Sequence, residues 1–425
     1  MLYPKREKDF TPEDFLNPSS EYRGTPFWAW NNKLDKDDLL WQIDQLKKMG
    51  FGGFHMHVRT GVATEYLCEE YMGIVCACIE KAREEKMLAW LYDEDRWPSG
   101  AAGGIVTKNP DFRMRHLLLT RKPYGSEVDK NSNSRSRGIS GRNENGVLIA
   151  CFDIILNKDG DLESYKRIDI NNDINDYKAD GFMLYAYMET AFCDPWYNNQ
   201  TYVNTLDPRS MREFIRVTYG AYDKHFKKDF GGVIPAIFTD EPQFSRQETL
   251  SFALKEQDVT LPWTFDIEET YKIAYNGESL TGGIPELLWN LSGCRISRTR
   301  YQFHDHVTER FTKAFADQCG QWCAQNNIML TGHMNGEQTL ESQTHSIGEA
   351  MRAFRSFQLP GIDMLCDHRE FTTAKQAQSA ARQSGIPGTL SELYGVTNWN
   401  FDLRGHKLQG DWQAALGVTV RVPHL

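Results

Sequence analysis

The sequence lacks the features that mark a membrane protein, an exported protein or a nucleic-acid binder. No stretch reaches the roughly 18 unbroken apolar residues of a membrane span, and the start, MLYPKREKDFTPEDF, lacks the charged-then-apolar order of a secretory signal. No lysine/arginine block stands out, and the formal net charge is -10. We therefore expect no membrane and no nucleic acid as partner. A cytoplasmic location is expected, or a secreted or periplasmic one if a leader was removed.

Cysteine is too scattered for a disulfide framework. The nine cysteines are an odd number spread through apolar runs, which favours a reducing compartment. The close pairs Cys76/Cys78 and Cys319/Cys323 lie in helical patterns, where buried free cysteine is common. No second cluster completes a zinc site around them, so we expect these thiols to pack in the core.

What the chain does have is a repeated alternation of short apolar runs with helix-length amphipathic segments, the pattern of βα units with a parallel sheet. Eight strand-like runs occur in order, at 25–30, 53–58, 88–92, 233–239, 328–332, 362–365, 389–393 and 418–422. They predict an α/β fold, a (β/α)₈ barrel of the TIM type. A doubly wound sheet is the weaker alternative, because no glycine-rich phosphate loop follows the first run.

The expected domain organisation is an N-terminal segment, 1–24, followed by a catalytic barrel, 25–425, with two interruptions. Residues 106–200 switch to β-like alternation and include the polar stretch 125–146, so we expect a β-rich insertion after strand three that forms a wall of the active site. Residues 243–297 form a second excursion after strand four. Because no eighth helix follows the last run, we favour a chain truncated after strand eight, with further modules of a longer protein beyond it.

Function is expected at the C-terminal ends of the strands, where barrels carry their reacting groups. Glycoside cleavage needs an acid that protonates the leaving oxygen and a second carboxylate. Glu241 and Glu392 follow apolar runs at strand ends four and seven, and Pro242 ends the strand just beyond Glu241. Candidates for binding a substrate at the other strand ends are His55, His57, Arg59, Asp93, Glu94, Trp97, Asp240, His333, Glu370, Trp399 and His424.

Seven motifs in order resemble the α-L-rhamnosidase family of glycoside hydrolases, family 106, and its uncharacterised relatives. They are RGTPFWAWN (23–31), MGFGGFHMHVRTGVATEYL (49–67), WLYDEDRWPSGAAGG (90–104), FTDEPQ (238–243), TGHMNGE (331–337), SELYG (391–395) and VPHL (422–425). The resemblance implies a carbohydrate substrate: a terminal L-rhamnose or similar deoxysugar is hydrolysed by two glutamates, assisted by a bound calcium ion.

Carried onto this sequence, the resemblance makes Glu241 the general acid. Glu392 matches the strand-seven position used by the wider superfamily of retaining barrel glycosidases. Glu337 and Glu370 are further candidates, for activating water or for holding calcium. Asp240 stands where that superfamily usually has an Asn before the acid, so a retaining mechanism is not implied.

Two other interpretations stay open. His55-x-His57 places two imidazoles on one strand face, and with His333 and His368 on later strands this is similar to metal-dependent hydrolases of the amidohydrolase type. That class needs an acidic residue after strand eight, where this chain has VRVPHL. The second alternative is a non-catalytic carbohydrate-binding relative. Zinc content would distinguish the first alternative from a glycoside hydrolase, and substitution of Glu241 by Gln would distinguish the second.

Overall fold

The computed structural model describes residues 11–127, 141–169, 174, 177–386 and 388–424. Residues 1–10 of the expected N-terminal segment and 128–140 of the polar stretch lie outside the described residues. Within them, no helix is long and apolar enough to cross a membrane.

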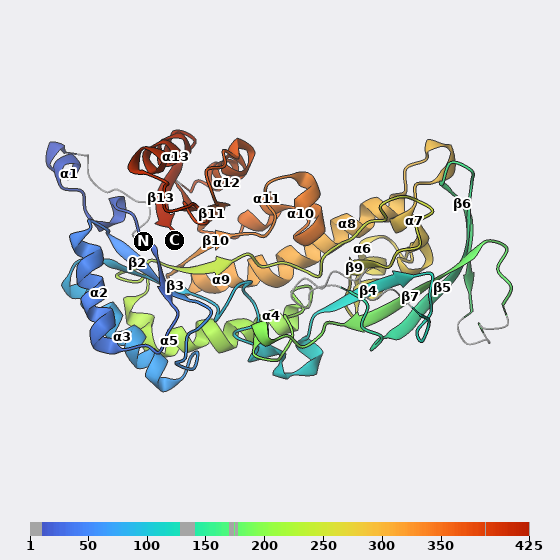
Figure 1. The fold of residues 1–425 in the computed structure, drawn as a ribbon, viewed down its shortest axis with the longest axis horizontal. Coiled ribbons are helices and arrows are strands. Elements are labelled where there is room, and N and C mark those ends of the chain that lie inside the picture. The colour runs from blue at the N-terminus through green and yellow to red at the C-terminus, as the bar shows by residue number, and fades with distance from the viewer. Residues whose placement is uncertain (1–10, 128–140, 170–173, 175–176, 387, 425) are drawn as a thin grey trace.

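Eight parallel strands form the barrel on one side of the molecule (Figure 1). In order round the sheet they are β1 (Phe27–Trp30), β2 (Gly53–Val58), β3 (Leu88–Tyr92), β8 (Ala236–Asp240), β10 (Met329–His333), β11 (Leu359–Met364), β12 (Thr389–Leu393) and β13 (Val418–Pro423). The Thr25 amide donates to the Arg421 carbonyl at 3.0 Å and brings the last strand beside the first. The predicted (β/α)₈ barrel is confirmed.

Helices connect the strands, and several of them begin at side-chain caps. The Asp35 carboxylate accepts from the amides of Asp37 and Asp38, and the Asp207 carboxylate accepts from the amide of Arg209, which satisfies amides that have no partner inside the helix. The helices of the barrel are α2 (Lys36–Lys48), α3 (Glu69–Glu84), α4 (Pro208–Phe214) continued by α5 (Gly220–Phe226), α8 (Arg298–Phe311) continued by α9 (Gln318–Gln325), α10 (Leu340–Ser346), α11 (Ala350–Phe354), α12 (Phe371–Gln383) and α13 (Leu403–Ala415). The remaining helices are α1 (Pro12–Leu16), α6 (Ile267–Ala274) and α7 (Pro285–Leu288).

A second, antiparallel sheet of five strands extends away from the barrel along the long axis of the molecule (Figure 1). Its order is β6 (Leu162–Ile168), β5 (Val147–Leu156), β7 (Phe182–Thr190), β4 (Arg115–Thr120) and β9 (Val259–Pro262). Four strands come from the expected insertion, but β9 comes from the second excursion and pairs with β4. The two interruptions of the barrel therefore build one sheet together.

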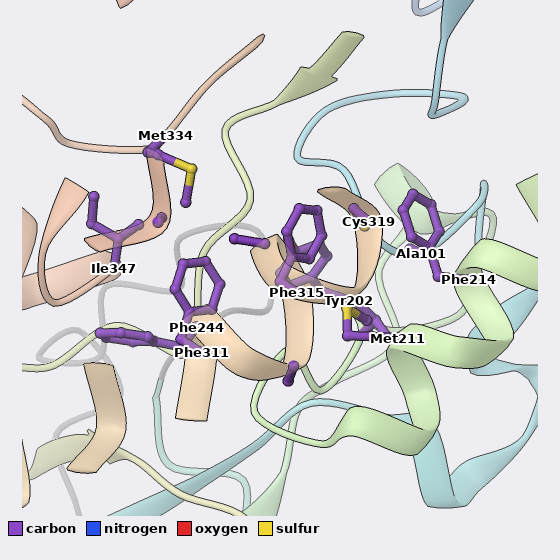
Figure 2. Close-up of a cluster of buried hydrophobic side chains, with 14 of the residues drawn as sticks. Ala101, Tyr202, Met211, Phe214, Phe244, Phe311, Phe315, Cys319, Met334 and Ile347 are labelled. Atoms are coloured by element: carbon purple, nitrogen blue, oxygen red, sulfur yellow. The ribbon is translucent and has the colours of Figure 1, made fainter. Parts of the chain in front are cut away.

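A buried cluster anchors the loops that leave the barrel strands (Figure 2). Met334 follows the end of β10, Phe244 lies just beyond Glu241, and Ala101 belongs to the loop after β3. These side chains are 1% exposed or less and pack with the following residues of Figure 2: Tyr202, Met211, Phe214, Phe311, Phe315, Cys319 and Ile347. Burying each large side chain contributes about 1.5–3 kcal/mol, so the loops at the barrel mouth are firmly held.

Candidate active site at the barrel mouth

Three buried side chains from three strands meet at the centre of the mouth. Asp240 ends β8 and lies beside His333, which ends β10. The His333 Nε2 atom is 2.7 Å from Glu392 Oε2 on β12 and 3.7 Å from Asp240 Oδ1. The Tyr92 hydroxyl donates to Asp240 Oδ2 at 2.6 Å. Neighbouring parallel strands end at one edge of the sheet, and this brings residues far apart in sequence together.

Glu392 is flanked by two imidazoles. Besides His333, the His424 Nε2 atom lies 3.7 Å from Glu392 Oε1, and Arg59 contacts His424 at 3.4 Å. Burial lowers the pKa of His333, but the hydrogen bond and charge of Glu392, with the charges of Asp363 and Asp240, outweigh burial and raise that pKa well above its usual value. His333 is therefore an imidazolium at neutral pH, facing the Glu392 carboxylate.

Two further carboxyl groups come from β11 and from the loop after β10. Asp363 on β11 is the register partner of Glu392, and the Asp363 amide donates to Glu337 Oε1 at 2.9 Å. Among the described residues, Glu337 Oε2 and Asp363 Oδ1 are buried without a hydrogen-bond partner. Burial is the main cause that raises the pKa of Glu337 to about 8 and that of Asp363 to about 9.

Glu241 follows directly after Asp240, the last residue of β8. Its φ of 47° is uncommon for a residue with a side chain, and its amide donates to the His333 carbonyl at 3.2 Å. After burial, the charge of Glu241 contributes to the raised pKa values of Asp240, Glu337 and Asp363. Glu241 is therefore electrostatically close to all three.

Glu241 also lines a polar pocket of about 580 Å³ at the mouth. The other lining residues are Trp97, Pro98, Gln243, Arg246, Asn335, Gly336, Thr339, Glu341, Ser342, His345 and Ser346. None belongs to 106–200, so the pocket wall comes from the loops after β3, β8 and β10 and from α10. The expected insertion contributes behind the wall, where Trp196 packs edge-on against Trp97 at 4.7 Å.

Ser99 fastens the loop after β3 to the end of β8. Its amide donates to the Asp240 carbonyl and its Oγ accepts from the Asp240 amide, both at 2.8 Å. The same hydroxyl donates to Asp93 Oδ1 at 2.5 Å, and Tyr219 donates to Asp93 Oδ2 at 2.9 Å. Through these bonds to Asp240, Ser99 holds the backbone just before Glu241, where φ is unusual.

Two expected substrate-binding residues, Asp93 and Glu94, instead support the loop after β3. Both are 0% exposed. The Glu94 carboxylate accepts the amides of Asp95 and of residues 100–103. Burial raises the pKa of Glu94 to about 8, opposed by these amides. The expectation fails because the chain folds back over the strand end and uses both carboxylates itself.

The histidines of β2 differ from each other. His55 is fully buried, hydrogen-bonds the Thr25 carbonyl at 3.0 Å and stacks on Trp90. Burial lowers its pKa to about 3. His55 lies two residues before His57 on β2, deeper in the barrel. Its expected role in binding substrate is therefore corrected. His57 lies higher, 4.0 Å from Asp240 Oδ2, and burial also lowers its pKa.

The remaining candidates lie farther out. Glu370 is partly exposed and accepts from the Thr373 hydroxyl at 3.0 Å. Trp399 is fully exposed on the loop between β12 and α13 and does not line the mouth pocket. Arg59 lies 5.2 Å over the Trp97 ring.

The sequence did not point to four residues of the site, which are Tyr92, Ser99, Asp363 and Arg246. Asp363 is a charged residue inside an apolar strand, and that signal could have identified it.

The donor set at the centre of the mouth does not suit calcium. Among the described residues, one group, Asp240, His333 and Glu392, has ligand atoms all within 4.8 Å of one another. Calcium takes roughly six to eight oxygen ligands, whereas His333 offers nitrogen and already bonds Glu392. The unpartnered oxygens of Glu337 and Asp363 do have the donor chemistry that a hard cation needs.

Comparisons with known proteins give a structural likeness. No known family profile and no curated protein matches the chain. A rhamnosidase from Novosphingobium sp. PP1Y has a similar solved structure, with a TM-score of 0.61 and 12% sequence identity. The match covers 97% of this chain and 56% of the rhamnosidase, so this chain spans about half its length. The chain has a rhamnosidase-like fold.

Proposed function

We propose that the chain is a glycoside hydrolase of the family 106 type that releases a terminal L-rhamnose or related deoxysugar. The observation that supports it most is that Glu241 lines the mouth pocket and lies close enough to Asp240 and Asp363 for its charge, like that of Glu392, to raise the pKa of both. Glycoside cleavage requires two carboxyl groups that act on one sugar. The rhamnosidase-like fold supports the choice of sugar.

In this proposal Glu241 donates its proton to the leaving glycosidic oxygen. Glu392 is the second carboxylate, which attacks the anomeric carbon or activates water. The His333 Nε2 atom, 2.7 Å from Glu392 Oε2, holds this carboxyl group in position for either role. Glu337 is less suited to that role, because burial raises its pKa to about 8 and keeps it protonated at neutral pH.

We also propose Glu337 and Asp363 as the residues that would hold calcium. When bound, the ion would supply positive charge that orients sugar hydroxyls. Glu370, the other expected ligand, already accepts from Thr373. Loading calcium at neutral pH would displace the protons that the raised pKa values of Glu337 and Asp363 hold there. Calorimetry in buffers of different ionisation enthalpy would detect that release.

The test is a screen of aryl glycosides, including 4-nitrophenyl α-L-rhamnoside, with the intact protein and Glu241→Gln, each with and without a calcium chelator. We expect hydrolysis by the intact protein and, on the aryl glycosides whose leaving groups need a proton, a loss of at least about a hundredfold in the variant, within the range ascribed to general acid catalysis. Full activity of Glu241→Gln on those substrates would remove Glu241 as the acid. Binding of sugar without turnover would instead favour the non-catalytic relative.

A metal-dependent hydrolase is the second candidate, favoured by the group Asp240, His333 and Glu392 and by His57, whose ring nitrogens are buried without a hydrogen-bond partner among the described residues. His55 does not join that group, because it bonds the Thr25 carbonyl deeper in the barrel. Stoichiometric zinc in the purified protein, with activity lost on its removal, would favour this candidate over the glycosidase.

A further inference from the structure

We propose that the mouth pocket binds an acidic sugar beside the one that is cleaved, and that Arg246 binds the carboxylate of this uronic acid unit. This inference rests on the proposed function. It names the leaving group, which neither the fold nor the catalytic carboxylates define.

The backbone around Arg246 is held from two sides. The amides of Phe244 and Gln247 donate to the carbonyls of Ser346 and His345, each at 2.9 Å. On the other side the Thr260 hydroxyl donates to the Arg246 carbonyl at 3.2 Å. Both sequence neighbours of Arg246 are buried, whereas Arg246 itself is exposed and lines the pocket. The fold therefore presents this side chain from a fixed base.

Among the described residues, the Arg246 guanidinium has no acidic partner. In the part of the chain that the structure describes, no carboxylate lies within 4.0 Å of it. Other arginines near the mouth and in the insertion are paired, as Arg96 is with Asp95 at 3.0 Å and Arg142 with Glu144 at 2.8 Å. A guanidinium offers a planar fork of donors that matches a carboxylate. An unpaired one in a pocket is available for an anion of the substrate.

The pocket has room for two sugar units. Its volume of about 580 Å³ lies within the ~300–1,000 Å³ range of sites for drug-sized ligands, which a disaccharide matches in size. Glu241 and Arg246 line the same pocket and are five residues apart, so their Cα atoms are at most about 18 Å apart. A leaving unit bound in this pocket is therefore within reach of both side chains.

The neighbouring polar groups suit a hydroxylated ligand. The Nδ1 atom of His345 hydrogen-bonds the Gln247 carbonyl, so Nδ1 carries the proton and Nε2 is left for the ligand. Asn335 and Thr339 also line the pocket. Besides Glu241, the acidic residue in the pocket lining is Glu341. It opposes an anionic ligand, and its exposure to water weakens that repulsion.

The experiment compares two disaccharides, rhamnosyl-(1→4)-glucuronate and its carboxyl-reduced form rhamnosyl-(1→4)-glucose. The readout is the ratio of the two kcat/KM values, charged over neutral. We expect the wild type to prefer the uronate about tenfold, which corresponds to about 1.4 kcal/mol. This is near the low end of the about 1.5–3 kcal/mol that a hydrogen bond to a charged group contributes, because Arg246 is exposed. The ratio should fall to about one in Arg246→Gln.

Two matched variants serve as controls. Arg355→Gln makes the same change at an exposed arginine outside the pocket and should keep the wild-type ratio. Glu341→Gln removes an acid from the pocket and should keep or raise it. Added salt should lower the ratio in the wild type, because the interaction is partly screened.

Equal kcat/KM values for both disaccharides in the wild type would overturn the inference, and so would an unchanged ratio in Arg246→Gln. If 4-nitrophenyl α-L-rhamnoside is hydrolysed in either case, the proposed function stands while the inference fails. If no glycoside is hydrolysed, the proposed function fails, and calorimetry with glucuronate and glucose decides the subsite. Tighter binding of glucuronate that Arg246→Gln abolishes would support it; equal binding of both would refute it.

Discussion

Replacement of Glu392 by Gln should lower the pKa of His333 while leaving its surroundings almost unchanged in shape. The hydrogen bond and charge of Glu392 are the leading causes that raise this pKa against burial. A hydrogen bond to a charged group contributes about 1.5–3 kcal/mol. The pKa of His333 should therefore fall, because the imidazolium loses a stabilisation of this size.

The assay is an NMR titration of protein with ¹⁵N-labelled histidine, with the His333 signal assigned by its loss in His333→Gln. The control is Glu370→Gln, which removes the carboxylate 3.9 Å from His368 and should not affect the His333 signal. A His333 titration that is identical in the wild type and in Glu392→Gln would refute the imidazolium–carboxylate pair and with it the reason for assigning Glu392 the second catalytic role.

Three further predictions concern the support of the site. Ser99→Ala removes the hydroxyl that joins Asp93 to the Asp240 amide and should lower kcat with little change in KM on the aryl rhamnoside; an equal change in KM would show that the loop acts through binding. Glu94→Gln turns an amide N–H₂ toward amides of the loop and should lower the free energy of unfolding by about 1–3 kcal/mol, measured by denaturant titration; an unchanged midpoint would contradict the structural role. The pKa of His55 is lowered from 6.5 to about 3, so its contribution to stability is complete above pH 6.5 and is lost as the pH falls toward 3. His55→Phe should therefore reduce the slope of the unfolding free energy against pH in that window by up to about 1.4 kcal/mol per pH unit. An unaltered slope would show that His55 does not take up a proton on unfolding.

The barrel could be predicted because each strand is a short apolar run separated by an amphipathic helix, and this pattern is local in sequence. The start of β11 was predicted three residues too late. The strand begins at Leu359, but Pro360 and Gly361 are atypical of strands and hid its first half in the sequence. Gly361 fits here because a Cβ atom would lie 2.5 Å from the Gly332 carbonyl oxygen, so the backbones of β10 and β11 approach too closely at this point for a side chain.

The site was predictable in its residue types but only partly in its contacts. Asp240, His333 and Glu392 were candidates because they end strands, and strand ends meet in space. The same rule also selected Asp93 and Glu94, which the loop after β3 uses for its own hydrogen bonds. The pairing of β9 with β4 could not be foreseen either, since it joins segments from two separate excursions. Contacts between distant segments are set by tertiary packing, which no local pattern records.

The central claim is that Glu241 protonates the leaving oxygen, and the most direct test is the dependence of Glu241→Gln on the leaving group. The account predicts that the variant hydrolyses a 2,4-dinitrophenyl rhamnoside, whose leaving group needs no proton, at close to the wild-type rate, while its rate on a methyl or disaccharide rhamnoside falls by at least about a hundredfold. An equal loss on both substrates would contradict the account, because Glu241 would then act in some way other than as the general acid.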